Sequence, residues 1–162
     1  MMTKLAQSQS ALLADQIRRA FDGEAWHGDS VLEILKGVDA ATASARPIKN
    51  AHSIWELVLH ITTWDEATIT RAGGKAFMPT DEQNFPPVKD TSEVAWKKAV
   101  ESLKKSHSKL VETVAAFPDS RLTDQVPGKS GDFYDFYYLF SGIVQHELYH
   151  AGQIALLKKA QG

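Results

Sequence analysis

The sequence contains no cysteine, and this absence restricts its chemistry more than any other feature of the composition. A chain without cysteine forms no disulfides, carries no thiolate nucleophile and builds no cysteine-based metal site. Histidine and carboxylate side chains are then the only strong metal ligands available. A metal ion bound by this chain must therefore be held through nitrogen and oxygen.

The sequence also lacks an excess of positive charge and long apolar runs. Its 18 Lys and Arg residues face 20 Asp and Glu residues, so little charge is available to neutralise phosphates or anionic lipid. Nucleic acid and membrane surfaces are therefore not expected partners. No run approaches the ~18 apolar residues of a membrane-spanning helix, and residues 1–13 lack the apolar stretch of a signal peptide. We expect a cytoplasmic protein.

No β-strand alternation or internal repeat is visible, and the apolar residues follow helical spacing instead. The length of 162 residues suits one domain, predicted over residues 1–162. We expect an all-α protein built as a four-helix bundle. The long helices are predicted over about residues 4–22, 53–71, 90–117 and 132–159, with a short helical piece at 31–35.

Two of these helices have recognisable start signals. Ser53 and Glu56 are spaced as a capping box, which fixes the start of the second long helix. Asp90 followed by Glu93 predicts the start of the third in the same way. Between them, residues 73–89 form an unusually long loop that contains three prolines. Such a loop is either a functional lid or an ordered surface crossover.

The fourth long helix places two histidines inside its apolar stripe. His146 and His150 are four residues apart, so they lie one turn above the other on the same face. Buried imidazoles without ligands would each need hydrogen-bond partners or incur a desolvation cost of about 1 to 3 kcal/mol. A pair with this spacing presents two nitrogens to one metal ion.

A third ligand is expected from the second long helix, where His60 lies among apolar residues and faces inward. His52 is eight residues earlier, about 12 Å along a helix axis, so we interpret it as a loop residue. His107 also faces the interior, and we interpret it as a core histidine that bonds a backbone carbonyl or a carboxylate. His27 lies at a turn, where it is either solvated or at the mouth of the site.

Residues 146–150 also match the pattern H-E-x-x-H, in which two histidines bind zinc and the glutamate activates water. Only twelve residues follow His150, which leaves no room for the downstream third ligand of zinc proteases, so we do not predict a protease. Glu147 lies at the edge of the stripe. It is a candidate catalytic base beside the ion, a hydrogen-bond acceptor for a ligand, or a glutamate on the surface or between helices.

The start of the fourth helix is dense in aromatic residues, spread nearly all round its axis. A helix that is apolar on every side is buried on several. These residues therefore predict either additional core, which we favour, or a dimer contact. The residues are Phe133, Tyr134, Phe136, Tyr137, Tyr138 and Phe140.

Two segments carry recognisable motifs: one runs from His52 to His60 and is followed by Trp64, and the other runs from Gln145 to Ile154. Both resemble the DinB/YfiT-like superfamily of metalloenzymes. Their order and separation, and the proline-rich loop between them, agree with that superfamily over most of the chain. The resemblance implies a four-helix bundle of the up-and-down type with a metal ion on His60, His146 and His150. It also implies a homodimer and an ion that is zinc or, second, nickel. Members include thiol-dependent S-transferases, an isomerase and hydrolases.

Three neutral histidine ligands leave positions on the ion open, as in catalytic zinc sites. We therefore expect an enzyme acting on a small molecule, either a metal-dependent hydrolase or a transferase of a low-molecular-weight thiol. Because the chain has no cysteine, such a thiol would be a co-substrate. The alternative is a non-catalytic, stress-associated bundle in which the ion fastens two helices together.

Overall fold

The computed structural model describes residues 7–129 and 134–162 and confirms an all-α protein. These described residues form seven α-helices and no β-strand, apart from one isolated bridge between Gln125 and Asp135. The helices are α1 (Gln9–Asp22), α2 (Val31–Leu35), α3 (Ala40–Ser44), α4 (Ile54–Ala72), α5 (Asp81–Asn84), α6 (Glu93–Ala115) and α7 (Phe136–Lys159). A 3₁₀ turn, Asp119–Arg121, lies between α6 and α7.

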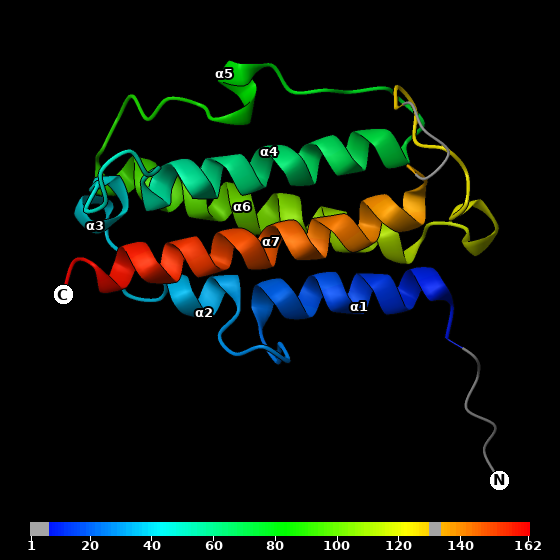
Figure 1. Ribbon diagram of the computed structural model, residues 1–162, viewed down its shortest axis with the longest axis horizontal. Helices are drawn as coiled ribbons and strands as arrows, with labels where there is room; N and C mark the ends of the chain where they lie inside the picture. The colour runs from blue at the N-terminus through cyan, green and yellow to red at the C-terminus, as the bar shows by residue number, and fades with distance from the viewer. Residues whose placement is uncertain (1–6, 130–133) are drawn as a thin grey trace, which may run out of the picture.

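The four long helices α1, α4, α6 and α7 lie side by side (Figure 1). Helix α4 packs against α6 and α7, and α1 packs against the same two helices. The pairs α1 and α4, and α6 and α7, therefore lie diagonally across the bundle. The short helix α2 contacts α1 and α7, and α3 contacts α4 and α6 at the same end.

The direction of the helices differs from a strict up-and-down bundle, because α4 and α6 run parallel (Figure 1). Trp55 near the start of α4 contacts Trp96 near the start of α6, at 5.2 Å between ring centroids. Further along, Asp65 accepts a hydrogen bond from Ser106. The long connection between these helices runs back along the outside of α4, so two consecutive helices share one direction. The order is up, down, down, up.

Several predicted helix ends are confirmed and others shift. The capping box of Ser53 and Glu56 is present with both of its hydrogen bonds. Helix α6 begins later than predicted, because Ser92 is its N-cap and Asp90 accepts a hydrogen bond from the backbone N–H of Ser92 instead. Helix α1 begins at Gln9 after the cap Ser8. Its predicted start at residue 4 and the predicted start of α7 at Asp132 lie outside the described residues; α7 is capped by Asp135.

The apolar core divides into two clusters along the bundle. One cluster joins α2, α3 and the first halves of α4 and α6 to the end of α7. The other joins α1, the end of α6 and the aromatic start of α7, where Phe136 and Phe140 are buried. Tyr137 and Tyr138 are about half exposed, so the aromatic segment is core on one side only. Phe133 lies outside the described residues.

None of the helices in the described part of the chain has the length and hydropathy that crossing a lipid bilayer requires.

Replacing the cap of α4 should destabilise the bundle. Ser53 Oγ accepts from the backbone N–H of Glu56, and Glu56 accepts from the backbone N–H of Ser53. Ser53→Ala removes one of these bonds and should lower the free energy of unfolding by about 1 kcal/mol. Urea denaturation measures the change. Ser108→Ala, at an exposed position of α6, is the control. Equal stability of the two variants would contradict the prediction.

Candidate metal centre

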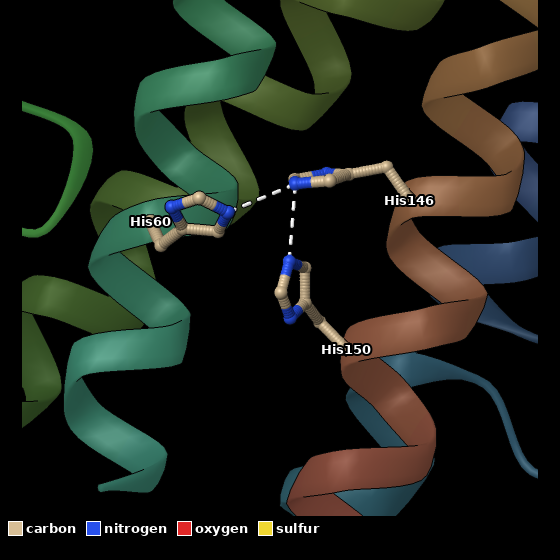
Figure 2. A group of neighbouring side chains, drawn as sticks. All are labelled: His60, His146 and His150. Carbon is tan, nitrogen blue, oxygen red and sulfur yellow. Dashed lines mark hydrogen bonds between the residues drawn. The ribbon is translucent and has the colours of Figure 1, made fainter. Parts of the chain in front are cut away.

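Three histidine side chains meet between the antiparallel helices α4 and α7 (Figure 2). The Nε2 atom of His146 lies 2.9 Å from Nε2 of His60 and 3.1 Å from Nε2 of His150. His60 and His150 are only 5% and 6% exposed. The structure thus brings together the three histidines predicted as metal ligands, with the same ring nitrogen of each directed to a common point.

The partners of the opposite ring nitrogens fix the protonation of two of these rings. His60 Nδ1 lies 2.7 Å from the backbone oxygen of Asn84, and His150 Nδ1 lies 2.6 Å from Oε1 of Gln153. Since these oxygens only accept, each Nδ1 carries the proton and each Nε2 presents a lone pair. His146 can donate to only one of these two lone pairs. The three nitrogens therefore share one proton between two lone pairs, and a positive charge at their centre would be attracted.

The spacing of the nitrogens suits a shared metal ion. With metal–nitrogen bonds of about 2.1 Å, neighbouring ligand atoms are about 3.0 Å apart in octahedral geometry and about 3.4 Å apart in tetrahedral geometry. The separations of His146 Nε2 from the other two nitrogens, 2.9 and 3.1 Å, are close to the lower value. The donor set and the spacing both fit a divalent cation held by three imidazoles.

The electrostatic surroundings keep these histidines neutral, which is the form that binds metal. Burial, with a smaller contribution from neighbouring histidines, lowers the pKa of His60 to about 4 in spite of its hydrogen bond to Asn84, and lowers the pKa of His146 to about 3. Burial also lowers the pKa of His150. Protons therefore compete poorly for these nitrogens at neutral pH.

The long loop after α4 is fastened over the site. Trp64 Nε1 donates to the side-chain oxygen of Asn84, whose backbone oxygen accepts from His60. The ring of Phe85 is stacked between His60 and His52, with centroid distances of 4.2 and 3.8 Å. This part of the loop is thus an ordered crossover that covers His60. His52 contacts the loop and is not in the histidine group.

A cavity of about 460 Å³ lies beside the three nitrogens, between α4 and α7. None of its described lining residues is an Asp, Glu, Lys or Arg. No fourth histidine or carboxylate of the described residues belongs to the histidine group. The lining residues are His60, Trp64, Thr68, Asn84, Phe85, Tyr134, Tyr138, Leu139, Gly142, Ile143, His146, Tyr149 and His150.

A family model described as the DinB superfamily matches residues 25–154. The chain belongs to the DinB superfamily. No curated protein and no solved structure gives a match. Membership agrees with the all-α fold and with the histidine group of this DinB protein, and it leaves the reaction open because one fold supports many activities.

Glu147, the candidate catalytic base, lies away from the histidine group of this DinB protein. Its carboxylate is fully buried, lies 3.1 Å from Nδ1 of His107, and does not line the cavity. His107 also lies 3.6 Å from Asp65, as expected for a core histidine that contacts a carboxylate. His27 is exposed at its turn and does not line the cavity.

Some residues of the site were not predicted from the sequence. Gln153 lies three residues after His150, on the same face of α7, so helical spacing offered a signal. Asp65 follows the buried Ile61 by four residues, and a charged residue on a buried stripe was a second available signal. Asn84 and Phe85 had none, because they reach the site only through the path of the long loop.

The metal-free DinB protein should lose stability as the pH falls below 7. Imidazoles of an unfolded chain titrate near 6.5, whereas burial lowers the pKa of His60 to about 4 and that of His146 to about 3. Between these values the unfolded chain binds more protons. The free energy of unfolding therefore rises with pH, by at most about 1.4 kcal/mol per pH unit for each histidine.

Urea denaturation at pH 5, 6 and 7 in the presence of a chelator measures this slope. His146→Gln should reduce it, whereas His52→Gln, at an exposed residue outside the group, should not. The pKa of His107 is raised to about 9 by Asp65 and Glu147 in spite of burial. Its stabilising contribution is complete below about pH 6.5 and is lost as the pH rises from there to 9, so it affects the pH 7 point of wild type and variants alike and cancels in their comparison. Equal slopes in wild type and His146→Gln would contradict the prediction.

Proposed function

We propose that this protein is a metal-dependent enzyme that transfers a low-molecular-weight thiol to a small, largely apolar electrophile. One divalent ion, zinc first and nickel second, would be held by His60, His146 and His150. The observation that supports this proposal is the direction of three imidazole nitrogens to one point beside a cavity whose described lining residues include no Asp, Glu, Lys or Arg. When bound, such an ion supplies positive charge that lowers the pKa of a thiol or water beside it.

The chain's own residues would perform three tasks around that ion. His60 and His150 keep their Nε2 lone pairs toward it, because Asn84 and Gln153 hold the protons on the opposite nitrogens. The loop residue Phe85 covers one side of the site and limits the access of water. The apolar walls around Leu139 and Ile143 bind an uncharged co-substrate next to the reacting atoms.

Thiol transfer is preferred over hydrolysis because none of the described residues that line the cavity is a carboxylate. Water attack is commonly assisted by a general base, and the buried Glu147 is directed to His107 instead. A thiol becomes a nucleophile through loss of its proton alone, and thiolates bind such ions well. Hydrolysis is the second candidate, supported by the positions that three protein ligands leave open on an ion.

A purely structural ion fits the site less well. Structural zinc sites are closed by four protein ligands, whereas this group has three within the described part of the chain. An ion that only fastened α4 to α7 would also have no need of a cavity beside it. The homodimer and the cytoplasmic location remain predictions, and the mass in solution tests the first.

Removing a ligand should abolish metal binding. Untagged, chelator-treated wild type should bind about one equivalent of Co²⁺ with the visible absorption of a nitrogen-ligated ion. His60→Ala and His150→Ala should each weaken binding at least about tenfold. His52→Ala, at a histidine that contacts the same loop, is the matched control. Metal binding that survives both ligand substitutions would disprove the site.

Filling the cavity should block turnover and leave metal binding intact. Gly142 lines the cavity, and a Cβ atom there would meet no other atom within 4 Å. Gly142→Phe should lower turnover of 1-chloro-2,4-dinitrobenzene with cysteamine at least about tenfold. Co²⁺ affinity should not change.

Gly152→Phe is the matched control, since Gly152 is an exposed residue of the same helix with equal space for a Cβ atom, outside the cavity. Turnover that is unchanged in Gly142→Phe would place the reaction elsewhere. Wild type that binds Co²⁺ but turns over only ester or amide substrates would replace the transferase proposal with the hydrolase.

A further inference from the structure

Behind the histidine group, three ionisable side chains from α4, α6 and α7 form a polar centre in the core, and a phenylalanine of α1 packs on it. His107 of α6 lies between Asp65 of α4 and Glu147 of α7, with Nδ1 3.6 Å from the first carboxylate and 3.1 Å from the second. Phe21 of α1 is stacked on the His107 ring at 3.8 Å. All three ionisable side chains are at most 4% exposed.

This polar centre is costly to bury, so its geometry is strongly constrained. Oδ1 of Asp65, both carboxylate oxygens of Glu147 and both ring nitrogens of His107 are buried without a well-formed hydrogen bond. Two buried carboxylates repel each other unless a positive group lies between them. Burial opposes a charge on His107, but both carboxylates outweigh burial and raise its pKa. The ring can therefore hold the carboxylates together only while both stay next to it.

The two carboxylates lie on the helices that carry the metal ligands. Asp65 is five residues after His60 on α4, and Glu147 is adjacent to His146 on α7. Helices α6 and α7 are diagonal partners, so the contact between His107 and Glu147 crosses the core. His107 thus links α4 and α7 on the core side, at the level where their histidines meet on the cavity side.

The same three residues could instead hold a second cation, since their ligand atoms lie within 4.8 Å of one another. Two observations favour the link. A metal-bound histidine usually donates its other N–H to a partner, and Nε2 of His107 has none. None of the three residues lines the cavity through which an ion reaches the histidine group.

We propose that His107 is a positioning residue for the metal site: through Asp65 and Glu147 it holds α4 and α7 at the separation at which His60 and His146 share one ion. This inference rests on the proposed metal site. It assigns Glu147 to the placement of His146, in place of the role of a base in the cavity.

Co²⁺ titration of the chelator-treated, full-length protein tests the link, with absorption spectra recorded alongside. His107→Leu leaves nothing to hold the two carboxylates, and the dissociation constant should rise about 10- to 100-fold with a changed visible spectrum. His107→Asn places an amide nitrogen near the position of Nδ1 and should restore most of the affinity. Leu110→Ala, one turn further along α6 in an apolar part of the core, is the control for general destabilisation and should bind as wild type does.

If His107→Leu does not fold, Asp65→Asn takes its place, since it keeps the side-chain volume and weakens one contact of the link. It should weaken Co²⁺ binding at least about threefold. Wild-type affinity and spectrum in the folded variant would overturn the inference, as would equal loss in Leu110→Ala. A second equivalent of Co²⁺ that persists in His60→Ala and disappears in Asp65→Asn would overturn it in favour of a second ion. Wild type that binds no Co²⁺ would refute the proposed metal site itself.

Discussion

The convergence of three imidazole nitrogens is the interaction on which the rest of the site depends. Two of these nitrogens present lone pairs, because Asn84 and Gln153 hold the protons on the far sides of the rings. Nε2 of His146 lies 2.9 and 3.1 Å from them and can donate to only one, whereas a cation between the rings would attract both lone pairs. The protein itself holds the rings in this arrangement through buried contacts of α4 and α7. The arrangement is therefore one that a cation stabilises.

The topology of the bundle and the cover of the site have the same origin. Because α4 and α6 run parallel, the chain must return along the whole length of α4 between them (Figure 1). That return places Asn84 and Phe85 against His60. A short turn between antiparallel neighbours would have left this side of α4 without cover. The long loop is thus a consequence of helix direction and a part of the site at once.

Helical periodicity was sufficient to predict most of the fold and the three histidines, because it reports which side chains face the core. His60, His146 and His150 all lie on buried stripes, so their meeting followed from the packing of two stripes. The direction of α6 was not predictable in this way, since periodicity carries no information on how helices are connected. Neither was the role of the loop at Asn84. The short helix α3 was missed because its five small and polar residues show no apolar stripe.

The prediction for Glu147 was incomplete, because the sequence shows its position on the helix but not the contact that orients its side chain. Spacing placed this residue at the edge of the stripe of α7, from which its side chain can turn to the cavity or to the core. The deciding contact is His107, on a helix that is not adjacent in the bundle. A sequence pattern such as H-E-x-x-H describes one helix only, so it cannot show a partner supplied from across the core.

Helix α7 separates two kinds of polar chemistry. Its cavity side presents His146 and His150, whose pKa values are lowered by burial, to a lining that holds no charged side chain among the described residues. Its core side presents Glu147 to a positive His107. Among the described residues, fixed charge is therefore kept behind the three histidines and away from the cavity. In the proposed reaction the ion would supply the positive charge and a co-substrate the nucleophile, so the protein's part would be placement and the exclusion of water.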